Sequence, residues 1–133
     1  MSPVFTVLDG SCTLNNSPSS YEVNGCVMSP NYTVSFYPGT RYVDTDSVTC
    51  TIQVNYDVNV RTQDVELGSA DYLEIARPGA PYPQRYYGGS NIPSSPDLQA
   101  DTTISFVTNS SDFQTGRGFR LCGYKPTGVA LNF

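Results

Sequence analysis

The stretch Ala70-Asp71-Tyr72-Leu73-Glu74-Ile75 decides the fold of this chain. Its apolar residues Leu73 and Ile75 alternate with neighbours that can face water, and the acidic residue Asp71 stands at the start of the pattern. Period-2 alternation is typical of a strand that buries one face and exposes the other. The stretch therefore predicts a half-buried strand with a carboxylate where the strand begins.

The rest of the chain repeats this pattern and shows almost no helical periodicity. Ten Pro and 11 Gly are scattered so that few windows longer than a dozen residues lack a helix breaker. Segments rich in Pro, Gly or Ser separate the short runs and predict turns at 37–40, 77–81 and 92–96. The alternating or apolar runs lie at 48–54, 58–60, 72–75, 103–107 and 119–124. Such runs predict an all-β, antiparallel β-sandwich or barrel, with positive φ angles supplied by Gly116-Arg117-Gly118 ahead of the last strand.

Composition excludes several classes of function. The 133 residues fit one domain, and no run of 18 apolar residues is present to form a transmembrane helix. Seven Lys and Arg against 12 Asp and Glu give a net charge of -5, without a basic cluster, so nucleic acid is a poor partner. The absence of His rules out His-dependent triads, His-ligated zinc and His acid–base catalysis. We expect no enzyme activity and no membrane insertion.

The cysteines and sequons favour a secreted protein. Cysteines stand at positions 12, 26, 50 and 122, without a C-x-x-C pair or the spacing of a zinc ribbon. An even number of widely spaced cysteines in a small chain predicts two disulfides and an oxidising compartment. Three N-x-S/T sequons make Asn15, Asn31 and Asn109 candidates for glycosylation.

Six segments occur in an order that is characteristic of one family. They are 25–32 (Gly-Cys-Val-Met-Ser-Pro-Asn-Tyr), 37–38 (Tyr-Pro), 50–54, 71–75, 85–95 and 118–121. Together they resemble the signature of the CUB domain, an extracellular β-sandwich module, from Cys12 to Tyr124. The resemblance implies a jelly-roll-like sandwich. It divides the chain into an N-terminal extension (1–11), a CUB-like domain (12–125) and a C-terminal tail or linker (126–133).

The resemblance also ranks the disulfide pairings. A typical member pairs its first cysteine with its second and its third with its fourth, but the third and fourth are both missing here. Cys12 and Cys50 keep the first pair, so parity leaves Cys26 to pair with Cys122. The pairing of Cys12 with Cys26 and of Cys50 with Cys122 ranks second.

Calcium is the cofactor that the resemblance implies. The ion takes six to eight oxygen ligands and needs neither His nor Cys. Family members that bind it use a Glu, two Asp and a Tyr from loops at one end of the sandwich. The matching residues here are Glu66, Asp71, Asp112 and Tyr37, with Asn109 competing for the place of Asp112. The spacing between Glu66 and Asp71 is shorter than the spacing in the family. If the missing residues fall at another point of the alignment, Asp64 takes the place of Glu66.

The expected function is a secreted interaction module whose calcium-ordered acidic edge receives Lys or Arg from a protein partner. One alternative is a glycan-binding module, similar to the spermadhesin branch of the family, that uses exposed aromatic residues. Tyr82, Tyr86 and Tyr87 cluster in one segment and are the candidates for that role. A structural component of a matrix or coat is a third option, which self-association would favour.

Overall fold

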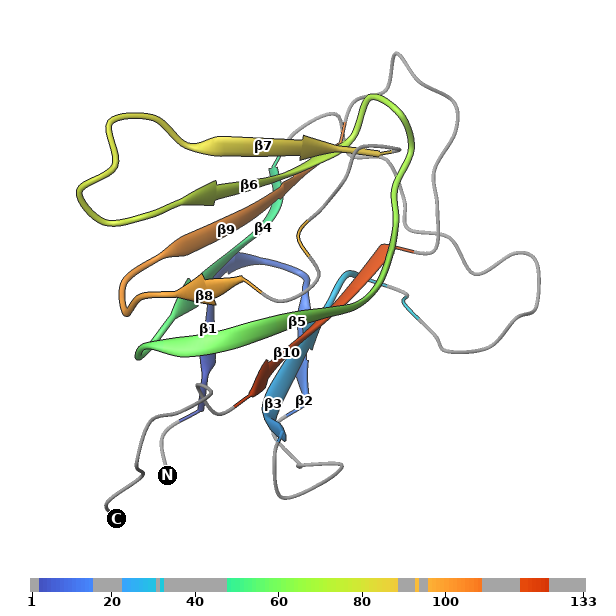
Figure 1. Ribbon diagram of the computed structural model, residues 1–133. Coiled ribbons are helices and arrows are strands. Elements are labelled where there is room, and N and C mark those ends of the chain that lie inside the picture. Colours follow the sequence, from blue (N-terminus) through green and yellow to red (C-terminus); the bar gives the residue numbers. More distant parts are fainter. Residues whose placement is uncertain are drawn as a thin grey trace.

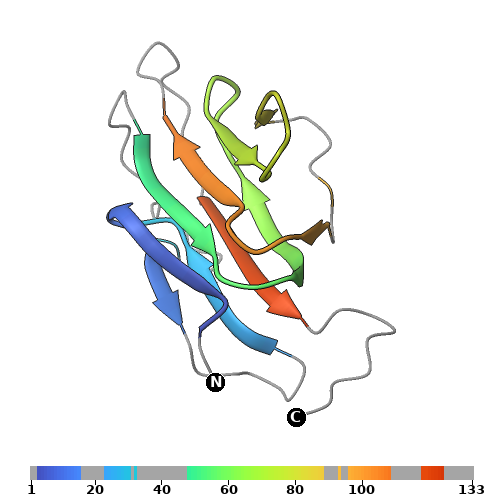
Figure 2. The same cartoon turned by 90° about the vertical axis from the view of Figure 1, so that its left-hand side faces the viewer.

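The chain folds as an antiparallel β-sandwich, so the predicted all-β fold class is confirmed. The computed structural model describes residues 3–15, 23–30, 32, 48–88, 93, 96–108 and 118–124. No helix occurs among these residues, and hence none that could span a membrane. Figure 1 shows β7, β6, β9 and β4 in one layer and β5, β10 and β3 in the other, and the turned view in Figure 2 shows the same two layers.

Each layer is a five-stranded sheet in which all hydrogen-bonded neighbours are antiparallel. Sheet A has the order β1 (Phe5–Gly10), β4 (Val48–Val54), β9 (Thr103–Val107), β6 (Tyr72–Ala76) and β7 (Gln84–Tyr87). Sheet B has the order β2 (Thr13–Asn15), β3 (Val23–Met28), β10 (Gly118–Tyr124), β5 (Val58–Glu66) and β8 (Asp97–Leu98).

The strands follow the sequence pattern closely in the middle of the chain. β4 and β9 have the predicted bounds, while β5 extends well beyond the predicted run 58–60. Gly118 opens β10 with a φ of 102°, the positive angle that its glycine was expected to supply. The N-terminus differs from expectation, because β1 pairs with β4 along its length. The sandwich therefore begins at Phe5, inside the segment 1–11 that was placed before the domain.

The core consists of the inward side chains of both sheets. Phe106 of sheet A meets Phe119 of sheet B edge to face, with ring centroids 5.1 Å apart. Ile52 and Ile104 lie beside Phe106 in sheet A, and all of these side chains are at most 1% exposed. Burial of each such side chain contributes about 1.5–3 kcal/mol, so this layer supplies most of the cohesion between the sheets.

Two disulfides reinforce the sandwich, and they are the pairs that the sequence ranked first. Cys12, just before β2, is bonded to Cys50 of β4 inside the core, and so ties the two sheets together. Cys26 of β3 is bonded to Cys122, which lies directly opposite on β10 within sheet B. The sequence separations of 38 and 96 correspond to about 4 and about 5 kcal/mol on the chain-entropy view.

Candidate functional site

The candidate site lies at the end of the sandwich where Asp71, one of the expected calcium ligands, is buried. Strands β3, β5 and β9 end there, and strands β4, β6 and β10 begin there, because each strand is antiparallel to its neighbours. Four buried polar residues close the core there, and we call this group the Asp71 end. Its members are Ser29, Thr49, Asp71 and Thr108.

Asp71 is the buried acid of this group, with 0% of its surface exposed. It occupies the next inward position of the alternation that buries Leu73 and Ile75 in β6. Its backbone is fixed on both sides, because its N–H donates to the carbonyl of Gly68 (3.0 Å) and its carbonyl accepts from the N–H of Gly88 (3.0 Å). Burial of a carboxylate costs free energy unless the group is paired or hydrogen-bonded. The folded chain must therefore meet this requirement at Asp71.

Gly88 shows how closely the backbone packs at the Asp71 end. A Cβ atom at this position would overlap the carbonyl oxygens of Leu67 and Gly68 in the β5–β6 connection. Only glycine lets the end of β7 approach that connection and donate to Asp71. Gly88 therefore holds the turn before β6 in place.

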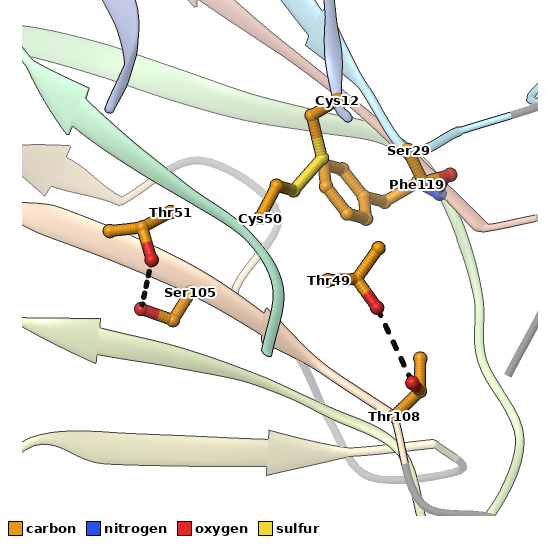
Figure 3. The surroundings of a disulfide bond; sticks show 8 residues. All are labelled: Cys12, Ser29, Thr49, Cys50, Thr51, Ser105, Thr108 and Phe119. Carbon is orange, nitrogen blue, oxygen red and sulfur yellow. Dashed lines mark hydrogen bonds between the residues drawn. A yellow bond between two sulfur atoms is a disulfide. The ribbon is translucent and has the colours of Figure 1, made fainter. Parts of the chain in front are cut away.

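A hydrogen bond between the hydroxyls of Thr49 and Thr108 (3.3 Å) joins β4 to the end of β9 beside Asp71. The register between these strands shifts at Thr49, because Val48 pairs with Val107 and Cys50 with Phe106. This bulge lets two consecutive residues of β4, Thr49 and Cys50, both be buried. Thr108 follows the inward alternation of β9, so the two hydroxyls meet inside the sandwich, as Figure 3 shows.

Ser29 closes the same end from sheet B. Its Oγ accepts a hydrogen bond from the N–H of Phe119 (2.9 Å), and its own N–H donates to the carbonyl of Phe119 (3.1 Å). These bonds extend the ladder between β3 and β10 by one residue. Phe119 belongs to the same buried cluster as the Cys12–Cys50 disulfide drawn in Figure 3, so Ser29 is linked to the cross-linked core through Phe119.

The expected calcium ligands are divided between described and undescribed residues. Asp71 is buried, whereas Glu66 is exposed at the last position of β5. Asp64 lies in β5, but its side chain is outside the described part, as are Tyr37, Asn109 and Asp112. Within the described part, no three side chains of His, Cys, Asp or Glu come together to hold a metal ion. Of the expected calcium ligands, the described part of the chain therefore includes one buried carboxylate, Asp71, and one exposed carboxylate, Glu66.

The three tyrosines expected to cluster point in different directions. Tyr82 is 80% exposed in the β6–β7 connection, and Tyr87 is 40% exposed on the outer face of sheet A. Tyr86 faces inward, where it packs against the core, and its hydroxyl donates to the side chain of Gln84 (2.9 Å). Tyr86 is therefore partly buried against the core, and its role as a binding aromatic stays a prediction. Among the sequons, Asn15 is exposed at the end of β2, and Asn31 and Asn109 lie outside the described residues.

Three members of the Asp71 end were missed by sequence reasoning. Thr108 could have been found, because it continues the inward alternation of 103–107 by one step. Thr49 could not, because its inward position depends on a bulge that no turn residue marks. Ser29 lies in the segment 25–32, which was used as evidence of the family resemblance and gave no prediction of burial.

Comparisons of the chain with models of known protein families, with curated proteins and with solved structures found no match.

Proposed function

We propose that the chain is a secreted, CUB-like interaction module whose Asp71 end is ordered by calcium. In this proposal the ion fixes the loops of that end and leaves an acidic edge that receives a Lys or Arg side chain from a protein partner. Binding is then ionic, calcium-dependent and weakened by salt. Catalysis is no part of the proposed function.

The observation that carries the proposal is the complete burial of Asp71 at the end of the sandwich where β5 ends and β6 begins. Carboxylates, carbonyls and hydroxyls are the hard oxygen ligands that calcium prefers. Asp71 would be the inner ligand and Glu66, exposed on the rim, an outer one. Glu66 lies opposite Gly118 in the β5–β10 ladder, and Asp112 shortly precedes Gly118 in the chain. Asp112 or Asn109, together with Tyr37, would complete the set.

Secretion is proposed on independent grounds. Two disulfides cross-link the sandwich, and such bonds persist in oxidising compartments. The exposed sequon at Asn15 fits passage through a glycosylating compartment.

Thermal melting in calcium, in magnesium and in chelator tests the proposal. An ion that binds only the folded chain raises the free energy of unfolding by about 3 kcal/mol at a hundredfold excess over its dissociation constant. We expect a higher melting temperature in calcium than in chelator and a smaller shift in magnesium, which tolerates irregular oxygen sites poorly. Coincident melting curves in all three conditions would contradict the proposal.

A further inference from the structure

The outer face of sheet A has an unusual charge pattern. Four of its five strands, β4, β6, β7 and β9, contain two charged residues, Glu74 and Arg85, and these form an ion pair (Arg85 Nε to Glu74 Oε2, 2.9 Å). The edge strand β1 carries one charged residue, Asp9. The strands of sheet B carry Arg61, Asp64, Glu66, Asp97 and Arg120. In a chain of net charge -5, the centre of sheet A is thus electrically balanced. A highly charged ligand finds little attraction there.

The register of sheet A arranges its outward side chains in rows across the strands. One row consists of Tyr87, Tyr72, Val107 and Val48, because each pairs with the next in the ladder. The Tyr72 and Tyr87 rings lie 4.9 Å apart, centroid to centroid. Tyr87 is 40% exposed and Val48 is 51% exposed, so this aromatic and apolar row is open to solvent at both ends.

The adjacent row carries hydrogen-bonding groups. It consists of Arg85, Glu74, Ser105 and Thr51. The Arg85 guanidinium donates a hydrogen bond to Glu74 (Nε to Oε2, 2.9 Å) and lies over the Tyr72 ring, 4.8 Å from its centroid. The hydroxyls of Thr51 and Ser105 lie 3.5 Å apart. The donors and acceptors are therefore fixed in place before any ligand arrives, which lowers the entropy lost on binding.

We propose that this face binds a neutral glycan chain lying across the strands, with sugar rings on the row of Tyr87 and sugar hydroxyls on the row of Arg85. Neighbouring strands are about 4.8 Å apart, which is close to the length of one pyranose unit, so successive sugars meet successive strands. A pyranose offers an apolar C–H face to an aromatic ring and a rim of hydroxyls to charged hydrogen-bonding groups.

A neutral glycan fits the face better than a protein does. Protein interfaces centre on a fully desolvated cluster of large side chains set in pockets. Here the large side chains are two tyrosines at one edge, and the middle of the face consists of small polar and apolar residues. The inference goes beyond the proposed function, because it uses none of the expected calcium ligands.

The test is a titration of the isotope-labelled protein, in chelator, with cellohexaose, chitohexaose and mannohexaose, followed by backbone amide NMR. A heparin hexasaccharide serves as the anionic comparison. We expect at least one neutral oligosaccharide to shift amide signals of β6, β7 and β9. We also expect Tyr87→Ala and Arg85→Lys each to weaken its binding at least tenfold, since lysine lacks the bidentate fork of arginine.

Arg61→Lys is the matched control. Arg61 also stacks on a tyrosine, 4.0 Å from the centroid of the Tyr124 ring, but on the outer face of sheet B. This variant should bind as the unaltered protein does, and all variants should keep its amide spectrum. The proposal is overturned if no neutral oligosaccharide shifts these signals at millimolar concentration, if only the anionic one binds, or if Arg61→Lys weakens binding as much as Arg85→Lys. A face that contacts only proteins would give the first of these results.

Discussion

Two pairs of hydroxyls join β4 to β9 on opposite faces of sheet A, and Figure 3 shows both. Thr49 and Thr108 meet inside the sandwich, where both side chains are buried, at 3.3 Å. Thr51 and Ser105 meet on the outer face, half-buried, at 3.5 Å. A hydroxyl that loses its partner inside the core stays desolvated, whereas one on the outer face regains water. Loss of a hydroxyl partner should therefore cost more stability at the Asp71 end than on the outer face of sheet A.

The largest difference between the two regions is expected from their acids. Asp71→Ala removes a fully buried carboxylate and leaves its surroundings unpaired, so we expect the free energy of unfolding to fall by about 3–5 kcal/mol. Glu74→Ala, on the outer side of the same β6 strand, breaks an exposed ion pair that solvent already screens and should cost far less. Urea denaturation of both variants measures the two losses in the free energy of unfolding. Equal losses would contradict the expected difference between the Asp71 end and the outer face of sheet A.

The glycines offer a second comparison. Gly88→Ala forces a methyl group against two backbone carbonyls at the Asp71 end, so we expect a loss of about 2–3 kcal/mol. Gly79→Ala lies in the exposed turn between β6 and β7, where a methyl group meets nothing within 4 Å. Its φ of +77° alone should cost about 1 kcal/mol. A Gly79→Ala variant as unstable as Gly88→Ala would show that packing at the Asp71 end is not what matters.

The two hydroxyl pairs are expected to give a smaller difference in stability. They compare the same kind of bond on the two faces of sheet A. Thr108→Val keeps the shape of the side chain but removes the bond to Thr49, so a loss of about 1–2 kcal/mol is expected. Ser105→Ala removes the equivalent bond on the outer face and should change stability by less than about 0.5 kcal/mol. Chemical denaturation measures the loss of stability in both variants. A larger loss in Ser105→Ala than in Thr108→Val would contradict the assignment of the Thr49–Thr108 pair to the inner face and of the Thr51–Ser105 pair to the outer face.

The smallest effect is expected at the opposite end of the sandwich. The Tyr56 hydroxyl is buried in the β4–β5 turn and has no hydrogen-bond partner among the described residues. Burial raises the pKa of Tyr56, so the unfolded chain loses this proton first and stability falls as the pH rises above about 10.

Tyr56→Phe should leave stability at neutral pH unchanged or slightly higher, because it removes an unpaired group. It should also reduce the alkaline loss of stability compared with the unaltered protein. Denaturation at pH 7 and at pH 10.5 measures both effects. A clear loss at pH 7 would mean that the hydroxyl has a partner in solution.

Much of the fold could be predicted from the sequence, and the reasons are physical. The alternation of 72–75 and of 103–107 fixes which side chains face the core. The strand β9 has the bounds of its run, and β6 is one residue longer than its run. The N-terminal strand was missed because Phe5–Gly10 contains one strongly buried side chain, Phe5, and is otherwise largely exposed. Its place at an edge depends on pairing with β4, which no local pattern encodes.

The candidate site was less predictable than the fold. Asp71 could be located because it continues a regular alternation into the end of the core. Thr49 is turned inward by a bulge, and Gly88 matters only through a close approach to Leu67 and Gly68 from a distant part of the chain. The roles of Thr49 and Gly88 both depend on tertiary contacts, which a local sequence pattern does not encode.

Calorimetric titration of calcium into the protein tests the central claim most directly. The account predicts one ion bound per chain, with affinity at least tenfold lower in Asp112→Asn. Affinity should be unchanged in Asp9→Asn, which alters an exposed acid on β1 in sheet A. Absence of a binding isotherm, or equal affinity in all three proteins, would contradict the account.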